Sequence, residues 1–175
     1  ISDGEVIVPS FVFISTVNNV MLSGAKVVFG EIESETLGLD FDDVKERVTD
    51  DTKAIILMHY AGMPARDTEK FVEFCNEKNI LLIEDAAEAH GAKSNGTCVG
   101  AFGSEAMLSF CQNKIVPVGE GGAVVTDSAE IYELLKLIRS HGRKDVDGVN
   151  FFSSVKDSDY VALGYNYRLP TISAA

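Results

Sequence analysis

Two apolar runs in the middle of the chain are each followed by a polar residue that can do chemistry. The run at 81–83 leads to Asp85, and the run at 106–110 is followed by a lone lysine, Lys114. A buried carboxylate is costly unless a cation or hydrogen-bond donors accompany it. An amine in apolar surroundings loses its proton more easily and becomes a nucleophile. The two residues therefore suit a reactive amine and a counter-ion for a cationic ligand atom.

Each of these residues also has an ordinary interpretation. Asp85 can simply cap the turn that follows its strand, and its position alone does not separate the two roles. A lone lysine such as Lys114 most often lies at the surface with its charge in water. The pair is more informative, because a pyridoxal phosphate enzyme needs a Schiff-base lysine and an aspartate for the pyridinium nitrogen. The glycines of segment 119–122 indicate a tight turn and no more.

Other candidate residues are ambiguous by themselves. Ser109, which precedes Lys114 in the same segment, can hold a phosphate or simply close a strand. His59 and His90 can act as general bases or ligands, although a partly buried histidine with a structural role is more common. No cluster has metal-ligand spacing, and no G-x-S-x-G element supports a hydrolase. No G-x-G-x-x-G follows the first strand, which disfavours a nicotinamide-dependent Rossmann oxidoreductase.

Composition limits the class of protein. The 175 residues include 15 Lys and Arg against 27 Asp and Glu, a net charge of −12. This charge argues against nucleic acid or an anionic membrane surface as a partner. No apolar stretch reaches the ~20 residues that span a bilayer. The three cysteines, Cys75, Cys98 and Cys111, form no C-x-x-C pair. They predict buried structural thiols in a reducing, cytoplasmic setting.

The elements that position the candidate residues alternate between strand and helix. Strands are expected at 5–9, 26–32, 54–58, 80–83, 106–110 and 122–126, and helices at 11–23, 41–48, 68–78 and 130–141. The expected helix caps are Ser10, Asp40, and either Asp127 or Ser128. An Asn-Gly pair at 95–96 predicts a hairpin. Segment 145–159 is polar and is expected to be irregular, and Pro170 can start a last helix.

The strands are apolar throughout rather than alternating. This pattern predicts an α/β fold with a mainly parallel sheet covered by helices on both faces. In such sheets ligands bind beyond the carboxyl ends of the strands. His59, Asp85, Glu88, Ser109 and Lys114 all lie at or just after such ends.

The sequence resembles the DegT/DnrJ/EryC1/StrS family of pyridoxal phosphate-dependent sugar aminotransferases, which have the fold type I (aspartate aminotransferase-like) structure. The order and spacing of several short segments carry the resemblance over nearly the whole chain. These segments are Glu5-Val6-Ile7-Val8-Pro9-Ser10-Phe11, Thr52-Lys53-Ala54-Ile55-Ile56, His59-Tyr60-Ala61-Gly62, Glu84-Asp85-Ala86-Ala87-Glu88-Ala89-His90-Gly91, Ser109-Phe110 through Lys114, Gly119-Glu120-Gly121-Gly122, Arg139-Ser140-His141-Gly142 and Gly164-Tyr165-Asn166-Tyr167-Arg168-Leu169.

The resemblance implies a role for each matching residue. Lys114 would form the Schiff base with the cofactor and then carry the proton between cofactor and substrate carbons. Asp85 would keep the pyridine nitrogen protonated, and Ser109 would bind the cofactor phosphate. Phe13 would stack on the ring. Asn166 would reach the phosphate in the neighbouring subunit's site, because family active sites are shared across a homodimer.

Glu88 stands where many family members have glutamine near the cofactor's phenolic oxygen. A glutamate there, together with the Asn113-Lys114-Ile115 run, resembles the perosamine synthase-like branch. A carboxylate beside a phenolate would repel it unless it is protonated or paired. The branch implies a 4-keto-6-deoxyhexose on a nucleoside diphosphate as substrate, GDP-linked in that branch, with glutamate as the amino donor.

The resemblance also bears on domain organisation. It places the family's Gly-Thr-x-Ala phosphate-binding helix start before residue 1 and a small C-terminal domain after residue 175. Residues 1–175 are therefore expected to be the core of the pyridoxal phosphate-binding large domain, truncated at both ends, with weak cofactor binding by itself. Two alternatives stay open. One is a sugar dehydratase of the same fold, whose members replace the lysine with histidine; the other is a non-catalytic scaffold or cofactor-sensing protein.

Overall fold

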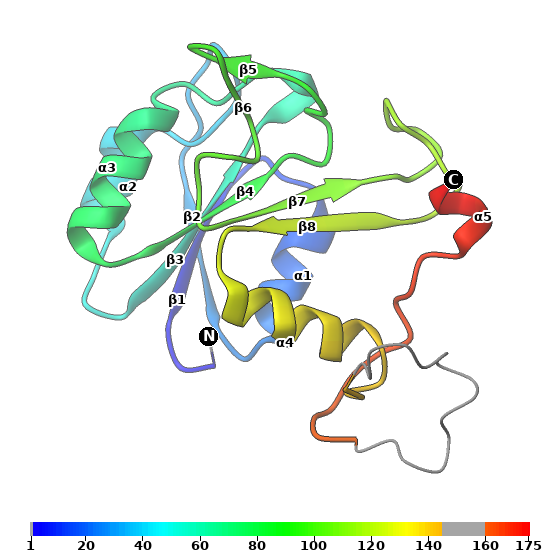
Figure 1. The fold of residues 1–175 in the computed structure, drawn as a ribbon. Helices are drawn as coiled ribbons and strands as arrows, with labels where there is room; N and C mark the ends of the chain where they lie inside the picture. Colours follow the sequence, from blue (N-terminus) through cyan, green and yellow to red (C-terminus); the bar gives the residue numbers. More distant parts are fainter. Residues whose placement is uncertain (1, 145–159) are drawn as a thin grey trace. The chain divides into compact units, whose positions relative to one another are not determined.

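A six-stranded sheet in the order β2-β1-β3-β4-β7-β8 is the framework of the molecule (Figure 1). The computed structural model describes residues 2–144 and 160–175. The chain divides into two compact units, residues 1–125 and 126–175. The strands of the sheet are β1 (Glu5–Pro9), β2 (Lys26–Gly30), β3 (Thr52–Met58), β4 (Leu81–Asp85), β7 (Glu105–Ser109) and β8 (Gly122–Thr126).

The first five strands in spatial order run in parallel, so their carboxyl ends meet at one edge. The pairs β1–β2, β1–β3, β3–β4 and β4–β7 are all parallel. β8 starts beside the end of β7, since a Cβ on Gly122 would come within 2.8 Å of the Leu108 carbonyl oxygen. β8 therefore runs in the opposite direction to β7. The expectation of a mainly parallel sheet is confirmed.

Helices cover both faces of this sheet, as expected (Figure 1). They are α1 (Ile14–Leu22), α2 (Phe41–Arg47) and α3 (Thr68–Lys78). Side chains on one face of the strands pack with α2 and α3 in a cluster of Ile7, Leu39, Val44, Ile55, Leu57, Ala65, Phe71, Cys75, Ile80 and Leu82. Side chains on the other face pack with α1 in a cluster of Val6, Val8, Val20, Ala25, Ala54 and Ile56. Alternation along the strands thus divides the core into two layers.

The first helix begins later than the sequence indicates. Ser10 was the expected cap, but its backbone N–H donates to the Gly30 carbonyl at 2.9 Å, which continues the pairing of β1 with β2. The chain stays non-helical until Phe13, the N-cap residue, which has no side-chain cap hydrogen bond. β2 also ends earlier than expected, at Gly30, because Glu31 donates its N–H to Asp43 instead (2.8 Å).

Other local expectations are confirmed. The Asp40 side chain caps α2 by accepting from the N–H of Asp43. The hairpin at 95–96 joins the short strands β5 (Lys93–Ser94) and β6 (Thr97–Cys98). The loop after β3 contains the 3-10 turn η1 (Tyr60–Gly62). Cys75 is buried, and desolvation raises the pKa of its thiol to about 11. Cys98 is exposed and Cys111 is half-buried, so the prediction of buried thiols is wrong for these two residues.

The second unit contains α4 (Ala129–Arg139) and α5 (Thr171–Ala174). Ser128, one of the two expected caps, accepts from the N–H of Ile131. Two of the segments that carry the family resemblance meet here, because Ser140 forms an antiparallel bridge with Asn166. A Cβ on Gly164 would come within 2.1 Å of the Gly142 nitrogen, so this close approach requires glycine. The predicted irregular segment 145–159 lies outside the described residues.

A buried carboxylate joins several parts of the first unit. Glu84 in β4 is 0% exposed and accepts hydrogen bonds from the backbone N–H groups of Gly100, Phe102 and Gly103, each at 2.7 Å. The Nε2 atom of His59 lies 3.0 Å from the same carboxylate. Burial by itself would raise the pKa of Glu84, but these hydrogen bonds lower it below its ordinary value. Glu84 therefore fixes the end of β3 and the turn that leads into β7.

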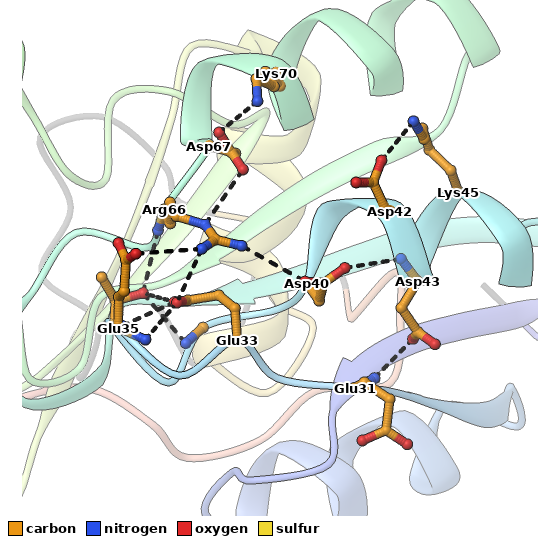
Figure 2. A network of polar contacts seen from close by, with 12 residues as sticks. Glu31, Glu33, Glu35, Asp40, Asp42, Asp43, Lys45, Arg66, Asp67 and Lys70 are labelled. Atoms are coloured by element: carbon orange, nitrogen blue, oxygen red, sulfur yellow. Dashed lines mark hydrogen bonds and ion pairs between the residues drawn. The ribbon is translucent and has the colours of Figure 1, made fainter.

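A second polar network ties two connecting loops together (Figure 2). Arg66 lies 3.5–3.8 Å from four carboxylates, those of Glu33, Glu35, Asp40 and Asp67. Glu33 is 5% exposed and also accepts from the Glu35 N–H at 2.6 Å. The network pins the loop before α2 to the loop before α3.

We expect Glu84→Gln to lower the free energy of unfolding by roughly 3–5 kcal/mol, since removing one partner of a buried charged network leaves the remaining polar groups unpaired. Urea denaturation of the full-length protein measures the change. The contribution is complete above the unfolded-state pKa of about 4.3 and is lost as the pH falls through the lowered folded-state pKa. The difference between the two proteins should therefore shrink in acid.

The matched control is Glu77→Gln, which alters an exposed glutamate of α3. A loss in Glu84→Gln no larger than that of the control, within about 0.5 kcal/mol, would contradict the role of the buried carboxylate.

Candidate active site

The candidate site lies at the carboxyl edge of the sheet, where β3, β4 and β7 end side by side. The register pairs Met58 with Asp85, and Asp85 with Met107. Glu88 lies in the loop after β4, Ser109 is the last residue of β7, and Lys114 lies in the loop after β7. The parallel pairing therefore brings residues from distant parts of the sequence to one edge, as the sequence indicates.

Asp85 ends β4 and is 5% exposed. Its Oδ1 accepts from the N–H of Ala87 at 3.2 Å, so the expected turn-capping role is present. Its Oδ2 accepts from the hydroxyl of Thr16 in α1 at 3.0 Å. Among the residues that the structure describes, no cation pairs with this carboxylate. A buried carboxylate satisfied only by neutral donors still attracts a cationic ligand atom.

Lys114 lies in the loop after β7, with its amine against Glu88. Its backbone N–H donates to the Cys111 carbonyl at 2.9 Å, which closes a turn. The Nζ atom is 3.1 Å from Oε1 of Glu88, and the side chain is 16% exposed. Glu120, the charged residue nearest to Lys114 in the sequence on its C-terminal side, lies 3.7 Å from the Cys111 sulfur. The Lys114 amine is therefore paired with a carboxylate from the loop after β4.

Glu88 joins two loops across the site. Its Oε1 accepts from Lys114, and its Oε2 accepts from the backbone N–H of Ala61 at 3.0 Å. Desolvation by burial would raise the pKa of Glu88, but the Ala61 and Lys114 hydrogen bonds lower it below its ordinary value. Glu88 is therefore ionised at neutral pH. A carboxylate at this position was expected to be either protonated or paired, and the Glu88 carboxylate is paired with Lys114.

A pocket of about 250 Å³ opens beside Glu88. Its lining is mostly apolar and aromatic, and consists of Phe11, Val12, Phe13, Met58, Tyr60 and Glu88. Phe11 and Tyr60 pack edge to face with ring centroids 5.0 Å apart. Phe13 is 70% exposed, so one face of its ring is available to a planar ligand. Aromatic walls with one charged group are typical of sites for small polar molecules with a flat ring.

Ser109 and the glycine turn form the other side of the loop. Ser109 closes β7, and its hydroxyl oxygen accepts from the Cys111 N–H at 3.3 Å. The strand-closing role is therefore present, while phosphate binding stays a prediction. Gly119 has φ +95°, a conformation that favours glycine. Phe110 donates its N–H to the Gly121 carbonyl at 2.8 Å, which shapes the loop that carries Lys114.

The remaining predicted residues either have structural contacts or lie in the second unit. His59 is fully buried, and its Nδ1 accepts from the Ala65 N–H at 3.0 Å. Nε2 must then carry the proton that faces Glu84, so His59 is a structural residue and not a general base. Asn166 lies in the second unit, and its role across a dimer stays a prediction. His90 packs edge to face on Phe110, at 5.5 Å between ring centroids.

Sequence reasoning missed two residues that define the site. Glu84 was left outside the expected strand 80–83, whereas it lies within β4, where a carboxylate directly before Asp85 points to the opposite face and needs its own donors. Thr16 was not singled out, because only the packing of α1 on the sheet brings it to Asp85. A threonine within the expected helix 11–23 was the one available signal.

The residues present fit a pyridoxal phosphate cofactor. An amine at the sheet edge, a buried carboxylate paired with no described cation, and an exposed aromatic ring are the groups such a cofactor needs. Other site types have less support. No group of histidine, cysteine and carboxylate residues in the described parts of the chain can hold a metal ion. No helix in those parts is long and apolar enough to cross a bilayer.

Solved structures identify the class of this fold. The aminotransferase PseC from Helicobacter pylori, involved in the biosynthesis of pseudoaminic acid, superposes with a TM-score of 0.88 at 29% identity over 99% of this chain. The GDP-4-keto-6-deoxy-D-mannose-3-dehydratase of E. coli, solved with bound hydrated PLP, superposes with a TM-score of 0.86 at 33% identity over 99% of the chain. The matched region is 44% of the first solved chain and 46% of the second. The fold is thus the large domain of the aspartate aminotransferase-like class.

The model of the DegT/DnrJ/EryC1/StrS aminotransferase family matches residues 1–175, and the chain belongs to this family. Among curated relatives, GDP-perosamine synthase of Vibrio cholerae is 40% identical over 171 residues, which is 98% of this chain and 44% of that protein. GDP-perosamine synthase of Escherichia coli O157:H7 is 36% identical over 176 residues, 100% of this chain and 46% of that protein. The chain therefore spans about half the length of the curated relatives it matches.

We expect the pKa of Glu88 to lie below its ordinary value of about 4.3 and to move upward in Lys114→Met, because one of the two interactions that lower it is removed. Carbon-detected NMR titration of the glutamate side chains measures both values. Lys93→Met, which removes an exposed lysine of the hairpin, is the matched control. An identical Glu88 pKa in the wild-type and Lys114→Met proteins would show that the ion pair is absent in solution.

Proposed function

We propose that this chain is the core of the large domain of a pyridoxal phosphate-dependent aminotransferase that transfers an amino group from glutamate to a keto nucleotide sugar. The observation that carries the proposal is the contact between Lys114 and Glu88 at 3.1 Å. Glu88 lies in the loop that follows Asp85 at the end of β4. Its contact with Lys114, which lies in the loop after β7, therefore brings the amine to the edge of the sheet at which Asp85 ends its strand. Family membership over residues 1–175 supports the same chemistry.

Each site residue has a defined task in this proposal. When bound, the cofactor supplies an electron sink that stabilises negative charge at the carbon losing its proton. Asp85 holds a proton on the ring nitrogen, which a buried anion at the end of β4 is placed to do. Lys114 provides the amine that holds the cofactor and then moves the proton between carbons. Phe13 stacks on the ring, and Ser109 holds the phosphate.

Glu88 sets the position of Lys114 before the cofactor arrives. Its carboxylate is anchored by the Ala61 N–H, so the Lys114 amine is held near the pocket rather than extended into water. The exposed fraction of the Lys114 side chain, 16%, agrees with this arrangement. Glu88, whose charge is shared between the amine and the backbone donor, would be one of the residues that hold the cofactor.

The substrate is proposed by analogy with the relatives. Two of them are GDP-perosamine synthases at 36% and 40% identity. We infer a 4-keto-6-deoxyhexose carried on a nucleoside diphosphate, GDP in the first instance. We further propose a cytoplasmic homodimer in which Asn166 of one subunit reaches the phosphate in the site of the other.

A dehydratase of the same fold is the alternative reaction. The E. coli dehydratase superposes as well as several aminotransferases do, so the fold does not separate the two. Lys114 favours amino transfer, because its amine can return the proton to the substrate carbon that accepts nitrogen. Mass spectrometry of the sugar product distinguishes the two reactions, since amino transfer adds nitrogen and dehydration removes water.

The test is to incubate the full-length protein with pyridoxal phosphate, glutamate and a panel of keto nucleotide sugars, and to follow 2-oxoglutarate. We expect turnover with a 4-keto-6-deoxyhexose nucleotide and visible cofactor absorbance. Lys114→Ala should abolish that absorbance and lower kcat by about 10³-fold or more, the scale of losing a catalytic nucleophile.

Lys93→Ala, at an exposed lysine, is the control and should match the wild type. Absorbance and turnover that persist in Lys114→Ala would refute the assignment of the amine. A wild-type protein that takes up the cofactor but transfers no amino group to any sugar would favour the non-catalytic scaffold.

A further inference from the structure

Thr16 contacts the residue on which the proposed cofactor chemistry depends. Its hydroxyl donates to Oδ2 of Asp85 at 3.0 Å, and both residues are 5% exposed. A carboxylate has only acceptor atoms, so the direction of this hydrogen bond is fixed. The other oxygen, Oδ1, accepts from the Ala87 N–H at 3.2 Å. One donor on each oxygen holds the plane of the Asp85 carboxylate in a single orientation.

We propose that Thr16 is a positioning residue that aims the Asp85 carboxylate at the ring nitrogen of the cofactor and sets the placement of Phe13. The proposal rests on the proposed function, since it assumes that Asp85 faces that nitrogen. It adds a residue on α1 that acts through Asp85 and need not touch the cofactor.

The alternation of β4 supports this assignment. Ile83 packs with the cluster on the α1 face, and Asp85, two residues later, points to the same face. Glu84 points to the opposite face, where His59 and three backbone N–H groups satisfy it. Asp85 therefore has to find its donors on the α1 side, and Thr16 is the side-chain donor there.

The first turn of α1 links Thr16 to the pocket. Phe13 is the N-cap residue of α1, and its carbonyl accepts from the Thr16 N–H at 3.1 Å. Phe13 lines the pocket, whereas Thr16 faces the sheet. Fixing Thr16 on Asp85 therefore fixes the rotation of α1 and, with it, the ring that the cofactor would stack on.

The electrostatics of α1 agree with the same contact. The first turn of the helix has no acidic residue, and its N-cap has no side-chain hydrogen bond. The positive end of a helix dipole favours an adjacent anion. The Asp85 carboxylate from β4 contacts this first turn through the Thr16 hydroxyl, so the helix end lies next to the group that would face the ring nitrogen.

A purely structural role for Thr16 makes a different prediction. If the hydroxyl only attached α1 to the sheet, its loss would lower the melting temperature and leave the cofactor's properties unchanged. Thr68 offers a matched comparison, because it is another buried threonine in the first turn of a helix. Its hydroxyl donates to the Ala65 carbonyl at 2.6 Å, outside the candidate site.

The experiment compares Thr16→Val, Thr16→Ser, Asp85→Asn and Thr68→Val in the full-length protein. Cofactor dissociation constants and the pH dependence of the visible absorbance are measured together with melting temperatures. Thr16→Val should weaken pyridoxal phosphate binding about tenfold, the scale of one hydrogen bond to a charged group. It should also shift the absorbance titration in the same direction as Asp85→Asn.

Thr16→Ser keeps the hydroxyl and should restore both properties, while Thr68→Val should lower only the melting temperature. A Thr16→Val protein with wild-type cofactor affinity and titration would overturn the role of Thr16 and leave the proposed function intact. Absence of Lys114-dependent absorbance in the wild type would instead overturn the proposed function itself. If Thr16→Val does not fold, Thr16→Ser and Thr16→Cys, which grade the strength of the donor, decide the question by their titrations.

Discussion

The buried carboxylate of Glu84 is the constraint on which the edge of the sheet depends. An ionised group with no exposed surface is stable only if donors surround it, and this chain provides three backbone N–H groups and one imidazole. Those donors come from the end of β3 and from the turn that enters β7. Because all of these donors bind the same carboxylate, the end of β3 and the start of β7 are held in register with β4, directly beside Asp85.

Two adjacent carboxylates thus have different surroundings. Glu84 faces the layer of α2 and α3, and its oxygens accept hydrogen bonds from structural groups. Asp85 faces α1 and accepts from only two neutral donors. Strand alternation makes this division possible, because neighbouring side chains leave the sheet in opposite directions. The same contact network explains why His59 has no part in the proposed chemistry. Both of its nitrogens are used, one by Ala65 and one by Glu84.

The charge at the mouth of the site is balanced locally. The chain carries a net charge of −12, yet the Lys114 amine faces a single carboxylate, Glu88, that is itself hydrogen-bonded to the backbone N–H of Ala61. Because of this pairing, a glutamate can stand at position 88, where an unpaired carboxylate would repel an anionic ligand. It also means that Lys114 is positioned by the loop after β4 rather than by its own loop, which consists largely of turns.

The sequence by itself determined the α/β class, the parallel sheet, the bounds of α3 and the placing of Asp85, Glu88, Ser109 and Lys114 at strand ends. Continuous apolar runs and helix caps such as Asp40 are local signals. They predict the elements correctly because the elements depend on sterics and hydrogen bonds between residues close together in the sequence. Only the tertiary structure decided that Glu88 faces Lys114, that α1 starts at Ile14, and that Thr16 meets Asp85. The physical reason is that these contacts join segments far apart in the chain, and their geometry follows from strand order and helix packing, which no local pattern encodes.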